Sequence, residues 1–187
     1  MRIFAAIDLD TSGLDVNKCE ILDIAIVPLN ADFTISTAVP EFTARVKAEH
    51  PETAEAQALQ VNRLDPNEGE SRGKVADDLQ RWLSDNGIES IIPVGQNLEF
   101  DLQFIAKVFP DFSRRIQHHK RDSMYLALAI NDIALRETGE PRFPKVSLSA
   151  LKDAFGIAGG VQHNAFEDAK DAAIVYRKLL GTLSLGG

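Results

Sequence analysis

Apolar residues recur along the chain in two patterns, as short continuous runs in the first half and at helical spacing over most of the rest. The runs predict strands at 2–8, 20–28, 34–37, 41–46 and 88–94. Apolar positions three and four residues apart predict helices at 53–62, 74–86, 98–109, 147–155 and 166–180, and one more that Asp122 caps and that runs to Ala134. The short connections between the early strands predict an antiparallel meander.

This order of elements predicts an α/β fold in which helices flank a mixed five-stranded sheet. A chain of 187 residues has the length of one domain with a substantial core. We therefore expect a single domain over 1–187 that ends in a flexible tail at 182–187. The composition, 44% hydrophobic and 26% charged, is typical of a globular protein rather than a disordered one.

The charge balance limits how the chain can hold nucleic acid. A net charge of −8 disfavours the basic face that long duplex DNA requires, although the excess acid can also serve solubility alone. A nucleic-acid ligand would then be a short end, a strand on a local basic patch, or one delivered by a partner. The basic segment 114–121 is either a solvated loop or such a patch. The lone Cys19 excludes an internal disulfide, and the lack of a long apolar run predicts a cytoplasmic protein without a membrane span.

Two carboxylates stand at the end of the first predicted strand. Asp8 and Asp10 project to the same side of an extended chain, where they repel one another unless a cation lies between them. The pair is therefore either a site for a hard metal ion or two ordinary turn and capping groups. Gly13 permits the sharp turn by which the chain leaves this strand.

Acidic residues also open two of the predicted helices. Asp101 and Asp168 each lie in a first helical turn, where they complement a helix dipole or join the pair on the strand. His163 lies on the glycine-containing loop just before the last helix. It is either an exposed loop residue or a base placed to accept a proton from water near neutral pH.

The order and spacing of these residues resemble those of the DEDDh, or DnaQ-like, 3′–5′ exonucleases, which include the proofreading ε subunit of bacterial DNA polymerase III, RNase T and oligoribonuclease. The family motif Asp-x-Glu-Thr-x-Gly is matched by Asp8, Asp10, Thr11 and Gly13. The motif Asn-x-x-Phe-Asp is matched by Asn97, Phe100 and Asp101, and the motif His-x-Ala-x-x-Asp by His163, Ala165 and Asp168. The resemblance covers roughly residues 3–180.

The resemblance implies a ribonuclease H-like fold that releases 5′-mononucleotides from the 3′ ends of single-stranded DNA or RNA. It implies two divalent ions, Mg²⁺ or Mn²⁺, and a catalytic set in which His163 is the general base and the metal ligands are Asp8, Asp10, Asp101 and Asp168. It places the terminal nucleotide against Thr11, Gly13, Leu14, Asn97 and Phe100, with Val61, Asn62 and Leu64 as candidates for a wedge against the terminal base. It also suggests a polymerase or another replication or repair protein as a partner.

One departure from the family pattern bears on activity. The family has Glu where this chain has Asp10, and the side chain is shorter by about 1.5 Å. Because Mg²⁺ requires near-octahedral geometry, the backbone must shift, a water must bridge the gap, or Mn²⁺ must be favoured. The alternative function is therefore a weakly active or inactive module that binds 3′ ends or a polymerase, and an endonuclease on the same fold is a third. Gln96, where many members have His, lies outside the metal set.

Overall fold

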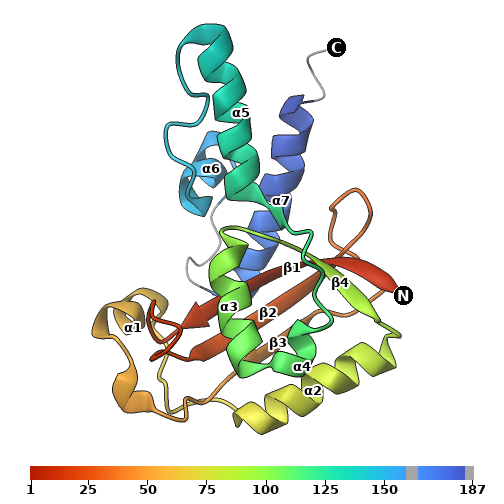
Figure 1. Ribbon diagram of the computed structural model, residues 1–187, viewed down its shortest axis with the longest axis vertical. Helices are drawn as coiled ribbons and strands as arrows, with labels where there is room; N and C mark the ends of the chain where they lie inside the picture. Colours follow the sequence, from red (N-terminus) through yellow and green to blue (C-terminus); the bar gives the residue numbers. More distant parts are fainter. Residues whose placement is uncertain (159–163, 184–187) are drawn as a thin grey trace.

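A five-stranded mixed sheet forms the centre of the protein in a computed structural model, which describes residues 1–158 and 164–183 (Figure 1). The strands lie in the order β3-β2-β1-β4-β5. Their bounds are Arg2–Thr11 for β1, Ile21–Leu29 for β2, Phe42–Arg45 for β3, Ser90–Gly95 for β4 and Arg121–Asp122 for β5. β1, β2 and β3 pair antiparallel, whereas β4 pairs parallel with both β1 and β5. The predicted mixed sheet and its opening meander are confirmed.

The fifth strand is not the one that the sequence predicted. Residues 34–37 make only an isolated bridge, between Ile35 and Leu29. The Asp32 side chain accepts hydrogen bonds from both the backbone N–H and the hydroxyl of Thr34, and this local turn competes with a regular ladder. The fifth strand is instead the two-residue β5, which directly precedes a helix.

The helices confirm most of the predicted pattern. Their bounds are Pro51–Thr53 for the 3₁₀ helix η1, Ala56–Asn62 for α1, Arg72–Asp85 for α2, Leu98–Val108 for α3, Pro110–Ser113 for α4, Ser123–Thr138 for α5, Leu148–Ala154 for α6 and Ala165–Leu183 for α7. The predicted helix at 53–62 divides into η1 and α1 because Ala54 is extended, with φ −66° and ψ 133°. Residues 182 and 183 belong to α7 and not to a tail, and 184–187 lie outside the described residues.

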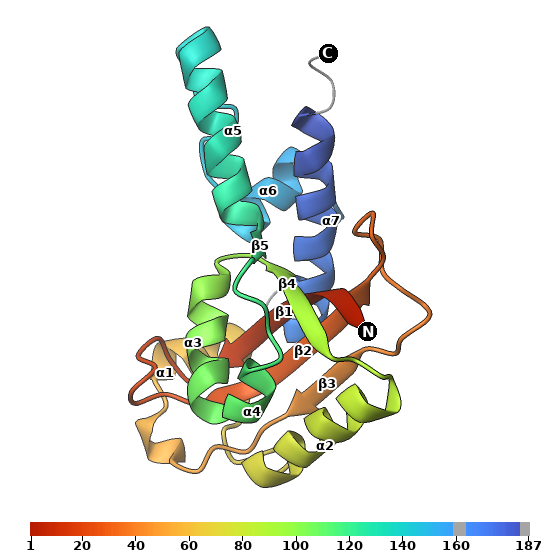
Figure 2. The same cartoon turned by 45° about the vertical axis from the view of Figure 1, so that its right-hand side comes forward.

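The sheet separates two apolar cores (Figures 1 and 2). One face packs against α2, α3 and α4, and the other packs against α7. Ala165, Ala169 and Ala173 of α7 belong to the second core together with Ala6 and Ala25, and these short side chains allow the helix to approach β1 and β2 closely. α5 and α6 pack on α7 in a third cluster, which stands clear of the sheet in Figure 2.

Within the described part of the chain, no helix combines the length and apolar character that crossing a bilayer requires.

The buried Asp122 carboxylate holds the starts of two helices. Its Oδ1 accepts a hydrogen bond from the N–H of Met124 at 2.9 Å, as the predicted N-cap of α5 should. Its oxygens also accept from the N–H groups of Asn97, at 3.2 Å, and Leu98, at 2.8 Å, at the start of α3. One side chain therefore fixes α3 and α5 relative to the end of β4 and β5.

We expect Asp122→Ala to lower the free energy of unfolding by about 2–4 kcal/mol, because three N–H donors at two helix starts lose a charged acceptor. Urea denaturation followed by circular dichroism measures the change. Asp132→Ala is the matched control, since Asp132 is exposed on α5, and it should change stability by less than about 0.5 kcal/mol. Equal losses in the two variants would contradict the double-cap interpretation.

Candidate active site

Strands β1 and β4 part near their carboxyl ends and leave an open edge on β1. β4 follows β1 only as far as the Ala6–Val94 pair, whereas β1 continues to Thr11. α3 occupies this edge with Asp101, whose Oδ1 accepts a hydrogen bond from the N–H of Leu9 at 3.1 Å. The carboxyl ends of parallel strands are where open α/β sheets bind their ligands.

Four predicted acids come together at this edge. Asp8 and Asp10 lie on the face of β1 that α7 covers, and Asp168 lies in the first turn of α7. Burial raises the pKa of Asp8 well above its usual value, and the charges of Asp101, Asp168 and Asp10 raise it further. Burial also raises the pKa of Asp101, against the opposing effect of backbone N–H groups that include that of Leu9. Three separate elements therefore bring the acids within electrostatic reach of one another.

This donor set fits a hard divalent cation. Carboxylate oxygens are the ligands that Mg²⁺ and Mn²⁺ prefer, and a cation would relieve the repulsion that raises the pKa of Asp8. Among residues 1–158 and 164–183, no three His, Cys, Asp or Glu side chains already stand at ligand spacing. Binding would therefore have to draw the carboxylates closer together.

A fifth carboxylate, that of Asp23, lies beside the four, and the sequence did not predict it as a site residue. Asp23 on β2 is the direct cross-strand partner of Asp10, so the two side chains share one face of the sheet. Burial and the charge of Asp10 raise the pKa of Asp23 to about 6, against the opposing charge of Arg45. The available signal was an acidic residue inside the otherwise apolar run at 20–28.

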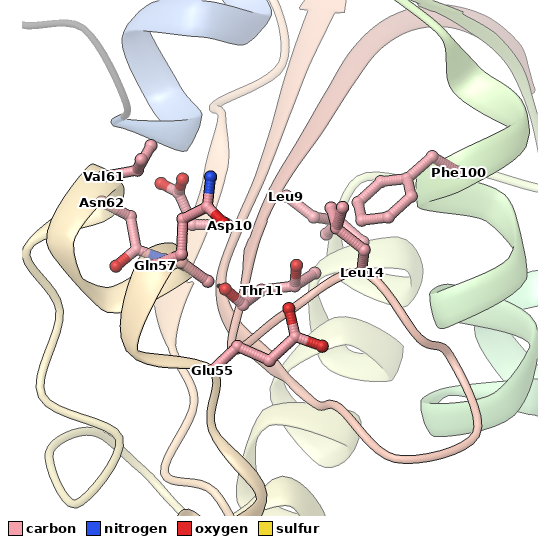
Figure 3. Close-up of a pocket in the computed structure, with 10 residues that line it drawn as sticks. Leu9, Asp10, Thr11, Leu14, Glu55, Gln57, Val61, Asn62 and Phe100 are labelled. Carbon is pink, nitrogen blue, oxygen red and sulfur yellow. Dashed lines mark hydrogen bonds between the residues drawn. The ribbon is translucent and has the colours of Figure 1, made fainter.

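A hollow of about 240 Å³ opens beside Asp10, and we call it the base hollow. Figure 3 shows Gln57 and Val61 of α1 on one side of it and Leu14 and Phe100 on the other. Leu14 is 77% exposed and Val61 46% exposed, so both present apolar surface to solvent. Such a pair of apolar walls suits the flat face of a nucleobase. The complete lining is Leu9, Asp10, Thr11, Leu14, Glu55, Gln57, Ala58, Val61, Asn62 and Phe100.

Hydrogen bonds fix the wall of the base hollow next to Asp10. The buried Asn62 donates from Nδ2 to the carbonyl oxygen of Thr11 at 3.0 Å and so ties α1 to β1. The Thr11 hydroxyl donates to the carbonyl oxygen of Gly13 at 2.8 Å. The backbone at the end of β1 is therefore set before any ligand arrives.

Gly13 is needed for space and not for a left-handed turn. Its φ lies outside the left-handed region, so the expected turn out of β1 does not depend on a conformation that glycine alone adopts readily. A Cβ atom at this position would lie 2.5 Å from Cys19 Sγ and 2.5 Å from Glu55 Cδ. Glu55 is exposed and its side chain can move aside, whereas Cys19 is buried, so the space taken by Cys19 Sγ is what favours glycine at this position.

The other predicted residues lie around the site in different ways. Asn97 is exposed at the start of α3, with φ 56°, outside the base hollow, and Leu64 lines a second hollow beside Asp23. Gln96 donates to the carbonyl oxygen of Val146 at 2.8 Å and so holds the segment that leads into α6. His163 lies outside the described residues.

The basic segment 114–121 is divided, with Arg114 and Arg115 away from the carboxylates and Lys120 against α3. Arg114 pairs with Asp111 at 2.6 Å, and Arg115 donates to the carbonyl oxygen of Glu89, just before the start of β4 and far along that strand from the site. Lys120 pairs with Glu99 on α3. The solvated-loop interpretation fits the two arginines.

The RNase T exonuclease family model matches residues 5–176, which include all of the acids described above. The chain belongs to this exonuclease family. The matched range also includes His163.

Individual relatives and solved structures agree with this membership. The 3′-5′ exonuclease DinG of Staphylococcus aureus strain MRSA252 is 27% identical over 174 residues, which are 92% of this chain but 18% of that protein. E. coli exonuclease I in complex with a dT13 oligonucleotide aligns with a TM-score of 0.73 at 18% identity, over 96% of this chain and 41% of that one. Its zinc-bound complex with single-stranded DNA gives a TM-score of 0.74 at 18% identity, over 98% and 43%.

These similarities show which fold the chain has and how much of each relative it matches. The fold is ribonuclease H-like, as the sequence resemblance implied. The chain spans less than a fifth of the length of the curated relatives that it matches.

The raised pKa of Asp23 predicts how stability depends on pH. In the unfolded chain this carboxyl ionises near 3.8 and in the folded protein near 6, so the folded protein holds the proton more tightly. Stability is therefore lost as pH rises from about 4 to about 6. Asp23→Asn removes this loss, and we expect the variant to be about 1–3 kcal/mol more stable than the wild type at pH 7 and similar to it at pH 4.

Urea denaturation in EDTA at both pH values measures this difference. Asp77→Asn, at an exposed position on α2, is the control and should change stability by less than about 0.5 kcal/mol at either pH. A variant at Asp23 that is less stable than the wild type at pH 7 would mean that this carboxylate stabilises the fold.

Proposed function

We propose that the chain is a 3′–5′ exonuclease that removes 5′-mononucleotides from single-stranded DNA or RNA, with Mg²⁺ or Mn²⁺ as its cofactor, two ions to a site. The observation that carries the proposal is the base hollow, which opens directly onto Asp10 and so onto the converging carboxylates. A nucleotide whose base lies in this hollow would have its 5′ phosphate next to the acids. The exonuclease family membership supports the same reaction.

Each acid has a distinct part in the proposed site. Asp8, Asp10 and Asp168 would hold one ion, Asp8 would also hold the second, and Asp101 would act mainly through the water around the second. When bound, the ions supply positive charge to the attacking and leaving oxygens of the phosphodiester. The hydrogen bond from the N–H of Leu9 orients the Asp101 carboxylate toward β1 before anything binds.

The remaining residues of the site orient the substrate and take up a proton. Leu14 and Phe100 would cover one side of the terminal base and Val61 the other. Thr11, which lines the hollow and is hydrogen-bonded to Gly13, would lie beneath the sugar. His163 would accept a proton from the attacking water, a role supported by its motif spacing from Asp168.

The shape and charge of the site favour a single-stranded end. A hollow of about 240 Å³ accommodates one unstacked base. Its walls are apolar and exposed, so they would not distinguish one base from another. The crystal structures of E. coli exonuclease I hold single-stranded DNA oligonucleotides, and we extend that substrate class to this chain. A polymerase or repair partner would supply the affinity for nucleic acid that a net charge of −8 opposes.

The second candidate is a weakly active or inactive 3′-end-binding module on the same fold. The short side chain at Asp10 favours it, because one ligand would stand about 1.5 Å farther from the ion than in the family pattern. The two candidates differ in whether a bound strand is shortened.

Shortening of a 5′-labelled single strand in Mg²⁺ or Mn²⁺ tests the proposal. We expect a ladder that moves from the 3′ end in the wild type, and a fall in kcat of about 10²–10⁴-fold in His163→Ala with metal affinity retained. Asp8→Ala should lose both turnover and Mn²⁺ binding, as measured by calorimetry. His50→Ala, at an exposed position, should keep wild-type rates.

An unchanged band with measurable strand binding would favour the inactive module. Wild-type Mn²⁺ affinity in Asp8→Ala would count against the ligand roles given to the acids.

The shorter acid at position 10 predicts a preference between metals. We expect the ratio of kcat in Mn²⁺ to kcat in Mg²⁺ to fall by about tenfold in Asp10→Glu. The longer side chain would bring its carboxylate to the short, near-octahedral ligand distance that Mg²⁺ requires. Titration calorimetry with each ion should show the same direction. Asp15→Glu, at a position outside the hollow after β1, should leave the ratio unchanged, and an unchanged ratio in Asp10→Glu would show that the backbone already compensates.

A further inference from the structure

A second hollow, of about 380 Å³, lies beside the carboxylates on the side of β2 and β3, and we call it the strand hollow. Its lining comes from β2, β3, the segment after α1 and the start of α7: Asp23, Glu41, Thr43, Ala44, Arg45, Leu64, Asn164 and Phe166. Asp23 lines this hollow and Asp10 lines the base hollow, and the two are cross-strand partners. The two hollows therefore meet at the acids.

The Arg45 side chain is held in place beside the strand hollow, which it lines. Its Nε donates to the carbonyl oxygen of Leu22 at 3.3 Å. Its backbone carbonyl accepts from the N–H of Glu70 at 3.0 Å, and Gly69 packs so closely that a Cβ there would lie 2.8 Å from the Arg45 backbone. Its Nη2 is buried away from solvent and has no hydrogen-bond acceptor among the described residues, so a phosphate in the hollow would pair with it only if the guanidinium turned toward the hollow. A buried donor left without an acceptor costs about 1–3 kcal/mol, so such a group requires an explanation.

Arg45 is also the one cation among the described residues that line either hollow. A nucleic-acid strand whose last base occupies the base hollow places its scissile phosphate at the acids. The rest of that strand must then run past the acids and away from the base hollow. The strand hollow lies there, bounded by Leu64 after α1 and by Asn164 and Phe166 at the start of α7. A guanidinium is suited to phosphate oxygens because its N–H groups match them in geometry and charge.

We propose that Arg45 binds the phosphodiester between the second and third nucleotides from the 3′ end, with the strand lying in the strand hollow. This proposal rests on the proposed exonuclease function, because the base hollow and the acids fix where that phosphodiester falls. It makes Arg45 a substrate-binding residue that the family motifs do not include.

The acids around Arg45 restrict what it binds. Asp23 and Glu41 line the same hollow, so a free anion would meet two carboxylates and one guanidinium. When a strand is already held at its 3′ end, its next phosphodiester is present at a high effective concentration beside Arg45. This offsets the repulsion between the phosphate and the two carboxylates. Arg45 therefore selects a strand of three or more nucleotides over free phosphate.

A substrate without the second phosphodiester isolates the contribution of Arg45. The p-nitrophenyl ester of thymidine 5′-monophosphate offers one nucleotide and a scissile bond, whereas a trinucleotide also offers the linkage assigned to Arg45. We expect Arg45→Gln to raise KM for the trinucleotide by about 10- to 100-fold and to leave hydrolysis of the ester unchanged. Arg81→Gln, on the exposed face of α2, is the matched control and should change neither.

Equal loss on both substrates would overturn the proposal, because it would mean that Arg45 supports Asp23 and the acids instead of the strand. Failure of the wild-type protein to hydrolyse the ester in either metal would instead count against the proposed function.

Neutralising the linkage tests the contact from the substrate side, without depending on how the variant folds. A single methylphosphonate between the second and third nucleotides should weaken binding to the wild type by about 10- to 100-fold, as measured by fluorescence anisotropy in Ca²⁺. The same change should have no effect on Arg45→Gln, and the slope of log Kd against log salt should fall by about 0.7 in that variant. Equal weakening of both proteins by the methylphosphonate would overturn the assignment of Arg45 to that phosphodiester.

Discussion

Mutual repulsion among carboxylates is the constraint on which the rest of this structure depends. Two like charges about 4 Å apart near a protein surface repel by about 4 kcal/mol, and here Asp8 lies within reach of Asp10, Asp101 and Asp168. The fold must hold such a group together with packing that lies elsewhere. The alanine-lined contact between α7 and the sheet supplies part of that support. The Asp122 carboxylate supplies another part by holding the start of α3, although its charge also raises the pKa of Asp101.

The same constraint explains why the site lies where β1 and β4 part. A fully paired strand would have no free N–H for a side chain to use, whereas the open edge of β1 lets Asp101 accept from Leu9. α7 begins on the other face at the level of the same edge, so its first turn brings Asp168 to the acids. Repulsion among the acids lowers the stability of the protein when no cation is bound. Cation binding removes this repulsion and so stabilises the folded protein.

The sequence predicted the parts of the site that short motifs carry and missed those that depend on strand register. Asp8, Asp10, Asp101 and Asp168 stand at the ends of strongly patterned elements, and a known family spacing linked them. The position of Asp23 could not be read in this way, because which residues face each other across β1 and β2 depends on the bulge after Asp10. The strand β5 was missed for a related reason, since two residues carry no periodic pattern. Gly13 was expected to serve the turn after β1, whereas the steric constraint from the buried Cys19 Sγ arises only once the loop before β2 is folded back.

Charge also decides how this chain can hold a polyanion at all. The net charge is −8, the site adds local negative charge, and the arginines at 114 and 115 lie at the far end of β4. In the proposed function, attraction would come from bound cations, from the apolar walls of the base hollow, and from the guanidinium of Arg45. Of these, the apolar walls act independently of ionic strength, and the cations act only at the last linkage. In the proposed function, a site built in this way would hold the 3′ end more firmly than the body of the strand, as removal of one nucleotide at a time requires.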